Sequence, residues 1–160
     1  MGARRWGVAC AALLFGCGEQ DDGLYTAAQA TETARAFHEA LVAGDGAGAA
    51  ARSMTPFRFQ ERDWAAPEQL QANWRKEAPR VQHLVRGLDR FEAFSRARLL
   101  RGEWPRNEQV PEDRRAGRLE KMNLGPHGFL VRVYGEGKAG YLLIVNERDP
   151  GALAVQGIDL

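Results

Sequence analysis

The first strong pattern in the chain is helical. Apolar residues recur every three or four positions from 27 to 41, and charged residues lie between them. This spacing places the apolar side chains on one face of an α-helix that packs on a core. Thr26 and Gln29 have the spacing of a capping box at its start, and Gly44 suits its end. The predicted core positions of this helix are Ala27, Ala30, Ala34, Phe37 and Leu41.

A shorter helix and a strand are predicted to follow. Asp45 can cap a helix over residues 47–54, which is stopped by Pro56. The alanine-rich sequence of this helix permits close packing against its neighbours. Residues 57–61 alternate apolar and polar side chains, which is typical of a half-buried strand.

The middle of the chain allows two interpretations. Pro67 suits the first turn of a helix, Trp74 lies on the apolar face of that helix, and Pro79 is expected to end it. The apolar spacing within residues 81–100 fits a helical stripe, but residues 88–95 fit a strand equally well. Periodicity alone slightly favours the helix, and the strand stays open as the alternative.

The last third of the chain predicts a helix and then a sheet. Residues 111–123 have the pattern of a helix. Three runs rich in β-branched and aromatic residues follow at 128–134, 141–146 and 153–158, separated by turn sequences. They predict an antiparallel meander. Helices followed by such a sheet indicate a single domain of the α+β class.

Composition narrows the class of protein. The 160 residues are 44% hydrophobic and 27% charged, with a formal net charge of +1. These values suit one globular domain and exclude a wholly disordered chain. No apolar run reaches the roughly 18 to 20 residues of a membrane-spanning helix, which excludes a polytopic membrane protein. The small net charge gives no attraction to nucleic acid, which is not expected as a partner.

The amino terminus has the pattern of an export signal. Arg4 and Arg5 precede a short apolar stretch, which is too short to span a membrane. The run Leu14-Phe15-Gly16-Cys17 resembles the lipobox of bacterial lipoproteins, with leucine at −3, a small residue at −1 and cysteine at +1. That resemblance implies cleavage before Cys17 and acyl chains on it, which anchor the protein in a membrane.

The lipobox resemblance divides the chain into three parts. They are a lipoprotein signal peptide at 1–16, a lipidated tether at 17–25 and a domain at 26–160. The expected location is the bacterial cell envelope, and Gly18 after Cys17 implies the outer membrane. Two alternatives stay open, namely a secreted protein cut near the same place and an uncleaved cytosolic protein.

The order of the motifs in the domain resembles a known family. The motifs are the helix Ala36–Asp45, the run Pro56–Phe59, a helix carrying Leu70 and Trp74, and the closing strand Ala154–Ile158. This order is similar to that of the nuclear transport factor 2-like domains, also called cystatin-like or ketosteroid-isomerase-like. The resemblance implies a curved antiparallel sheet that wraps a long N-terminal helix to form a cone.

The resemblance has further implications for structure and chemistry. It favours a strand at 88–95 and makes the stretch 100–123 longer than the usual connection. Enzymes of the family place an acidic general base inside the cone, which points here to Glu61 or Asp63. Neighbouring arginines equally predict surface ion pairs for both acids. The residues expected to line the pocket are Phe37, Phe57, Phe59, Trp74 and Phe94.

Other catalytic patterns are missing from the sequence. His38, His83 and His127 lack metal-ligand spacing, so no metal site is predicted. There is no phosphate-binding glycine loop and no serine nucleophile motif, and no cofactor is expected. His38 is predicted at the edge of the polar face of the first helix.

Charge is distributed unevenly along the chain. Residues 75–121 hold 13 Lys and Arg against eight Asp and Glu, whereas residues 18–74 hold four against nine. The basic part could form a face for anionic lipid headgroups or an acidic envelope partner. The alternative is a solvated helix face with internal ion pairs.

Three hypotheses for function follow. The first is an exported, lipid-anchored envelope protein whose domain binds a small apolar ligand or another envelope protein without catalysis. The second is a small isomerase- or dehydratase-like enzyme that uses Glu61 or Asp63 inside the cone. The third is a structural envelope subunit, which a cone filled by its own aromatic side chains favours. An inward carboxylate in an apolar pocket would support the enzyme, whereas two solvent-exposed acids would argue against it.

Overall fold

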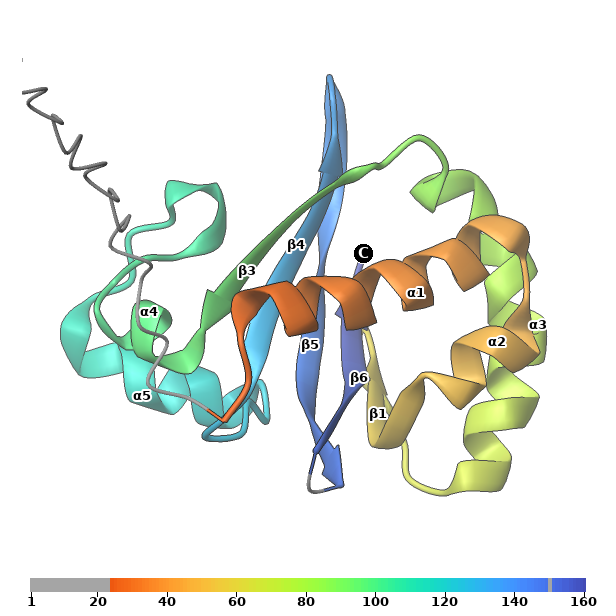
Figure 1. The fold of residues 1–160 in the computed structure, drawn as a ribbon, viewed down its shortest axis with the longest axis horizontal. Helices are drawn as coiled ribbons and strands as arrows, with labels where there is room; N and C mark the ends of the chain where they lie inside the picture. Colours follow the sequence, from red (N-terminus) through yellow and green to blue (C-terminus); the bar gives the residue numbers. More distant parts are fainter. Residues whose placement is uncertain (1–23, 150) are drawn as a thin grey trace, which may run out of the picture.

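The computed structural model of the chain describes residues 24–149 and 151–160. Figure 1 shows helices arranged around one central sheet. The predicted single domain of the α+β class is confirmed. The elements in chain order are α1 (Ala27–Ala43), α2 (Gly46–Ala51), β1 (Ser53–Phe59), β2 (Arg62–Trp64), α3 (Pro67–Val85), β3 (Arg90–Ser95), α4 (Arg96–Leu100), the 3-10 helix η1 (Pro105–Asn107), α5 (Glu112–Lys121), β4 (Phe129–Gly135), β5 (Lys138–Asp149) and β6 (Ala152–Asp159).

The sheet is mixed rather than wholly antiparallel. Its strand order is β2-β1-β6-β5-β4-β3. The strands β4, β5 and β6 form the predicted meander, but β1 and β6 run parallel, so the prediction of an antiparallel sheet is wrong at this pair. Parallel neighbours need a long connection, and most of the chain lies between these two strands. Residue alternation records the faces of a strand and not its direction relative to a distant partner.

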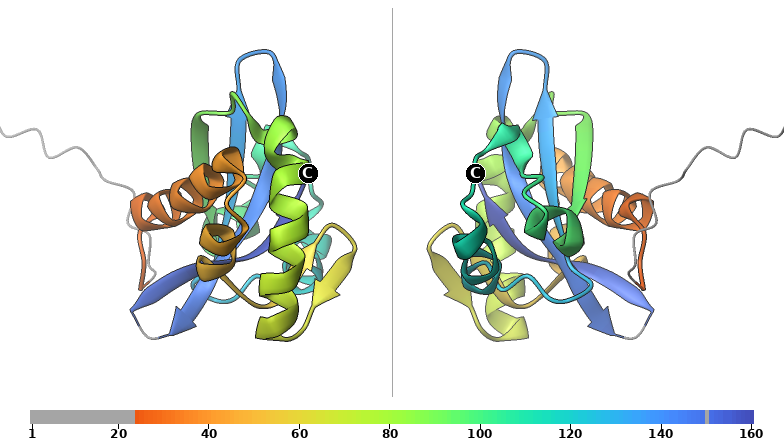
Figure 2. Two further views of the ribbon diagram at one scale, coloured as in Figure 1. Left: turned by 90° about the vertical axis from the view of Figure 1, so that its right-hand side faces the viewer. Right: turned by 90° about the vertical axis from the view of Figure 1, so that its left-hand side faces the viewer.

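The helix α1 begins and ends where the sequence predicts. The Thr26 hydroxyl accepts a hydrogen bond from the Gln29 N–H, and the Gln29 side chain accepts one from the Thr26 N–H. Gly44 adopts φ 68°, a left-handed conformation that glycine reaches without steric cost. Figure 2 shows α1 along one face of the sheet, with the hairpin of β5 and β6 bent beneath it.

The helix α2 is shorter than predicted, and β1 begins earlier. α2 ends at Ala51, and the next carbonyl accepts a hydrogen bond from the Val155 N–H, which brings the chain into the sheet. β1 contains Pro56 in a cis peptide bond instead of starting after it. The predicted bounds of the helix, 47–54, and of the strand, 57–61, are therefore wrong, because this tertiary contact ends the helix earlier and starts the strand earlier.

The helix α3 continues through Pro79, contrary to the prediction that this proline ends it. Pro79 removes one backbone donor from the helix. The cost is offset because apolar residues on both sides of it, Ala78, Val81 and Val85, are buried in the core. The strand β3 follows, so residues 90–95 adopt the strand rather than the helix.

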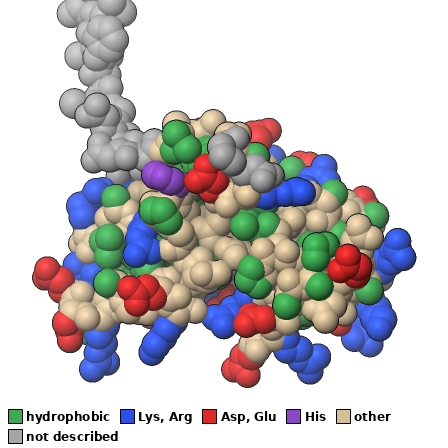
Figure 3. Space-filling model, turned by 90° about the horizontal axis from the view of Figure 1, so that it is seen from below, with side chains coloured by type: hydrophobic (Ala, Val, Ile, Leu, Met, Phe, Trp, Pro, Cys, Tyr) green, Lys and Arg blue, Asp and Glu red, His purple; other side chains and the backbone are tan. Residues whose placement is uncertain are grey.

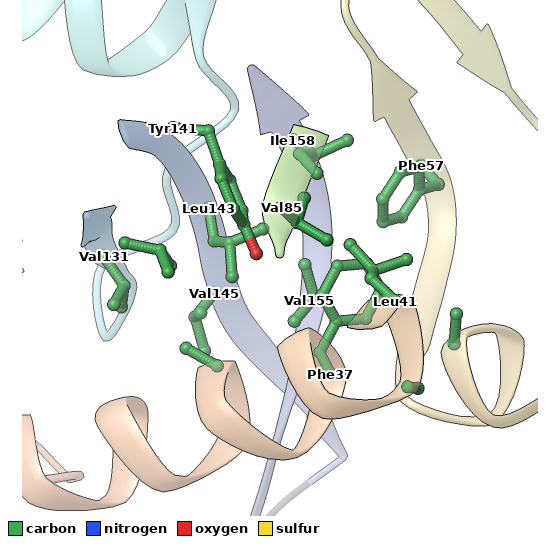
Figure 4. Packing of buried hydrophobic residues seen from close by; sticks show 14 of the residues in the cluster. Phe37, Leu41, Phe57, Val85, Val131, Tyr141, Leu143, Val145, Val155 and Ile158 are labelled. Carbon is green, nitrogen blue, oxygen red and sulfur yellow. The ribbon is translucent and has the colours of Figure 1, made fainter. Parts of the chain in front are cut away.

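Two clusters of buried side chains lie on opposite faces of the sheet. Residues alternate between the clusters along β3, β4 and β5, so that Val131 belongs to one and Leu130 to the other. In the main cluster, Phe37 and Leu41 of α1 point toward the sheet (Figure 4). The second cluster packs the segment 96–124, including the predicted helix α5, on the other face. Its members are Phe94, Leu99, Trp104, Val110, Leu119, Leu124, Leu130 and Ile144.

Candidate functional site

Aromatic side chains fill the space between α1, α3 and the sheet. Phe37, Phe57 and Trp74 are 0% exposed. The ring centroid of Trp74 lies 5.3 Å from that of Phe37 and 5.3 Å from that of Phe57. The Trp74 Nε1–H donates to the Ser53 hydroxyl at 3.1 Å, so the polar atom of this ring also has its partner.

The five side chains expected to line the pocket do not all meet. Phe59 joins the cluster through Trp64, on which it stacks with ring centroids 5.1 Å apart. Phe94, by contrast, lies in the second cluster on the opposite face. The reason is the alternation along β3, in which Ala93 faces the main cluster and the next residue faces away.

A groove of about 830 Å³ lies between the β1–β2 turn, α3, α5 and the end of β6. Its apolar lining joins the two clusters, because it includes Phe59 and Trp64 of the main cluster and Leu130 and Ile144 of the second. α1 and α5 lie on opposite sides of the sheet (Figure 2). This groove is the candidate functional site.

Charged side chains surround the groove. Arg58 pairs with Asp63 at 3.2 Å, and its Nη1 donates to the Lys121 carbonyl at 2.7 Å, which ties β1 to the end of α5. On α3, Arg80 lies 3.4 Å from Glu77. Charged residues of both signs line the groove, and five of these seven residues are exposed.

Glu61 and Asp63 do not have the surroundings that a general base needs. Both are exposed, and Asp63 is engaged by Arg58. Glu61 lines the groove but is not enclosed by apolar walls. The geometry therefore favours the surface interpretation of these acids over proton transfer inside the cone.

His38 lies in the core and not at the edge of the polar face, which corrects the sequence prediction. It is 5% exposed, and its Nδ1 lies 2.7 Å from the Tyr141 hydroxyl. Burial lowers the pKa of His38, and hydrogen bonding to the Leu88 backbone opposes this effect. Burial also raises the pKa of Tyr141. Position 38 lies on the same helical face as Ala34 and Leu41, and this spacing in the sequence predicts that its side chain is buried.

The arginines of the basic segment are largely bonded within the protein. Arg115 donates to the carbonyls of Val110 and Leu100, each at 3.0 Å. Arg98 donates to Glu103 at 2.7 Å. On the face in Figure 3, Lys and Arg, Asp and Glu and small hydrophobic areas are interspersed. This arrangement favours the interpretation of a solvated face with internal ion pairs.

The described residues hold no group of three or more potential metal ligands. Within 24–149 and 151–160, no helix combines the length and apolar character needed to cross a membrane. Cys17 and the signal segment lie outside the described residues. Tyr25, at the end of the predicted tether, is 4% exposed and is hydrogen-bonded to Glu147 and Gly151.

Comparison with protein-family models gave no match, and comparison with curated proteins gave none. Among solved structures, the chain is similar to a domain of unknown function with a cystatin-like fold from Nostoc punctiforme. The two chains are 15% identical, with a TM-score of 0.37. The match covers 84% of this chain and 76% of the other.

Proposed function

We propose that this protein is a lipid-anchored protein of the bacterial cell envelope whose domain binds a partner protein without catalysis. The anchoring part rests on the export signal pattern and on the lipobox resemblance at Cys17. The binding part rests on the groove beside α5. The two parts are tested separately below.

The single observation that carries the binding proposal is the lining of the groove. Apolar side chains form part of the groove, including Leu130, Ile144 and Ile158, and charged side chains of both signs stand around them. Such a surface suits a protein segment that inserts apolar side chains and pairs its charges at the edges. The aromatic cluster around Trp74 fills the space between α1, α3 and the sheet, which argues against an enclosed apolar ligand there.

The tether limits where the partner can be. Tyr25 is held in the domain by its hydroxyl, which donates to Glu147 at 3.0 Å and accepts from the Gly151 N–H at 2.9 Å. Only residues 17–25 connect it to the lipid site, a chain length that spans at most about 30 Å. An anchored domain therefore meets partners that lie close to the same membrane.

Anchoring is tested by intact mass and membrane fractionation of the native protein beside a Cys17→Ala variant. The proposal expects an acylated mass and membrane residence that are both lost in the variant. A protein that is soluble and unacylated without the substitution would overturn the anchoring part and leave the groove untouched.

Binding is tested by photo-crosslinking in the native host. A crosslinking amino acid at Arg62 or Asn73, which both line the groove, is expected to give one discrete protein adduct. The same amino acid at Glu39, exposed on α1, is the matched control. Leu142→Glu places a charge in the groove and is expected to remove the adduct. No adduct, or the same adduct from Glu39, would overturn the binding part.

A further inference from the structure

A second pocket contains two buried hydrogen-bond donors without partners. It has a volume of about 410 Å³ and is lined by residues of β3, β4 and the segment 98–109. The donors belong to two of its lining residues and are Nε1 of Trp104 and Nε of Arg132. Neither atom has an acceptor among the residues that the structure describes. None of the lining residues of this pocket lines the groove.

Unpaired buried donors are rare in folded proteins because they lose their hydrogen bonds to water and gain none in return. Trp104 is only 4% exposed, and its indole nitrogen is shielded from solvent. Two such donors on residues that line one pocket indicate an acceptor that enters from outside the chain.

The Arg132 side chain is held in a fixed plane. It lies in the middle of β4, where its register partners are Glu92 on β3 and Leu142 on β5. Its guanidinium carbon lies 4.4 Å from the centroid of the Tyr134 ring. The parallel N–H groups on one edge of such a guanidinium match the geometry of a planar anion.

The Trp104 ring is held equally firmly. It belongs to the second core cluster, and the Arg118 guanidinium carbon lies 4.7 Å above its ring centroid. Its N–H therefore has a fixed direction. Phe94 is the other aromatic side chain in the lining of the pocket.

Most other charges of the pocket are already neutralised. Arg98 donates to Glu103 at 2.7 Å and to the Ala93 carbonyl at 3.1 Å. This pairing holds the pKa of Glu103 below its usual value. Glu108 pairs with Arg118. Arg132 has no such carboxylate partner among the described residues, although Glu92 stands opposite it in the sheet register.

We propose that this pocket binds the carboxylate of a small organic acid, with the Arg132 Nε–H and the Trp104 indole N–H as its donors. A carboxylate is planar and accepts two parallel hydrogen bonds from one edge of a guanidinium. The aromatic lining residues Phe94 and Trp104 suit an aromatic body on that acid. The site is independent of the proposed groove and of the lipid anchor.

The test uses the indole N–H signals of the full chain in nitrogen-15 correlated NMR spectra. The Trp104 signal is assigned by its loss in Trp104→Phe, and the chain is titrated with sodium benzoate. The Trp104 signal is expected to move downfield and saturate, whereas that of Trp74, already bonded to Ser53, is expected to stay in place. Inorganic phosphate and sodium chloride are titrated in parallel.

Substitutions then identify the donors. Arg132→Met is expected to weaken benzoate binding by at least about tenfold, because it removes a charged donor. Arg90→Met, which removes an exposed positive charge from β3, is expected to leave the affinity unchanged. Trp104→Phe is expected to weaken binding about fivefold, read from the other shifted amide signals.

Several results would overturn the proposal. They are a Trp104 signal that benzoate does not move, an equal shift in Arg132→Met, and saturation by phosphate but not by carboxylates. A lone ordered water on the two donors would give the first result. If Arg132→Met fails to fold, the benzoate affinity of Glu92→Gln tests the proposal instead. Removing this nearby negative charge is expected to tighten binding about two- to fivefold, and unchanged or weaker binding would contradict the site.

Discussion

The Tyr141 hydroxyl lies 2.7 Å from Nδ1 of His38, within hydrogen-bonding distance, and both side chains are buried between α1 and the sheet. Burial lowers the pKa of His38 more than hydrogen bonding to the Leu88 backbone raises it. Arg35 and Glu39 are the charged groups that act on His38 from its own helix, and they act in opposite directions.

The buried imidazole makes stability depend on pH. The pKa of His38 is lowered in the folded state, so the unfolded chain binds more protons below its own histidine pKa of about 6.5. The stabilisation is fully present above that pH and is lost as the pH falls toward the lower folded-state pKa. The free energy of unfolding, measured in urea from pH 7.5 to 5.5, is expected to fall by at most about 1.4 kcal/mol per pH unit.

The control for this pH dependence is a second histidine. His38→Gln is expected to flatten the slope, whereas His83→Gln, at an exposed position, is expected to preserve it. An equal slope in the wild type and in His38→Gln would show that other groups cause the dependence.

Tyr141→Phe is expected to destabilise the domain without removing packing volume. The substitution leaves Nδ1 of His38 buried without its hydrogen-bond partner, which costs about 1–3 kcal/mol. Tyr134→Phe, at a half-buried position on β4, is expected to change the free energy of unfolding by less than about 0.5 kcal/mol. Equal effects of the two substitutions in urea unfolding would contradict the role of this hydrogen bond.

Phe37→Ala is expected to lower the free energy of unfolding by about 3–5 kcal/mol. Phe37 is 0% exposed and packs on Trp74, so its loss leaves a cavity that the surrounding rings cannot fill. Leu84→Ala is the matched control, because Leu84 is 54% exposed and its loss is expected to cost about 0.5 kcal/mol or less. A small effect of Phe37→Ala would mean that the core between α1, α3 and the sheet is loosely packed.

Tyr25→Phe is expected to loosen the turn between β5 and β6. The substitution removes the acceptor of the Gly151 N–H, so the hydrogen exchange of that amide is expected to accelerate by about tenfold. The Val155 amide, bonded to the Arg52 carbonyl, is expected to exchange at its original rate. Unchanged exchange at Gly151 would show that the Tyr25 hydroxyl does not protect this amide.

Much of the fold can be predicted from short segments of the sequence. The capping box at Thr26, the left-handed Gly44 and the meander of β4 to β6 are all readable from short segments. The misjudged elements depend on tertiary contacts. α3 continues through Pro79 because residues before and after this proline are buried in the core. α2 ends early because the Arg52 carbonyl accepts a hydrogen bond from Val155 of β6.

The candidate sites were harder to predict than the fold. Periodicity indicates that Phe57 and Trp74 are buried, but it cannot say whether they line a space or fill it. Phe94 was assigned to the wrong face because the sequence between 81 and 100 did not fix which strand residues point inward. The donors of Trp104 and Arg132 are far apart in sequence, and only the packing of 98–109 on β4 brings them to one pocket.

The place of β6 in the sheet has a consequence for the order of folding. β6 lies between β1 and β5, so within the described chain it alone joins the pair β1–β2 to the group β3–β5. Without residues 152–159, these two groups of strands share no hydrogen-bonded edge. The sheet can therefore be completed only after the last of its described strands has been synthesised.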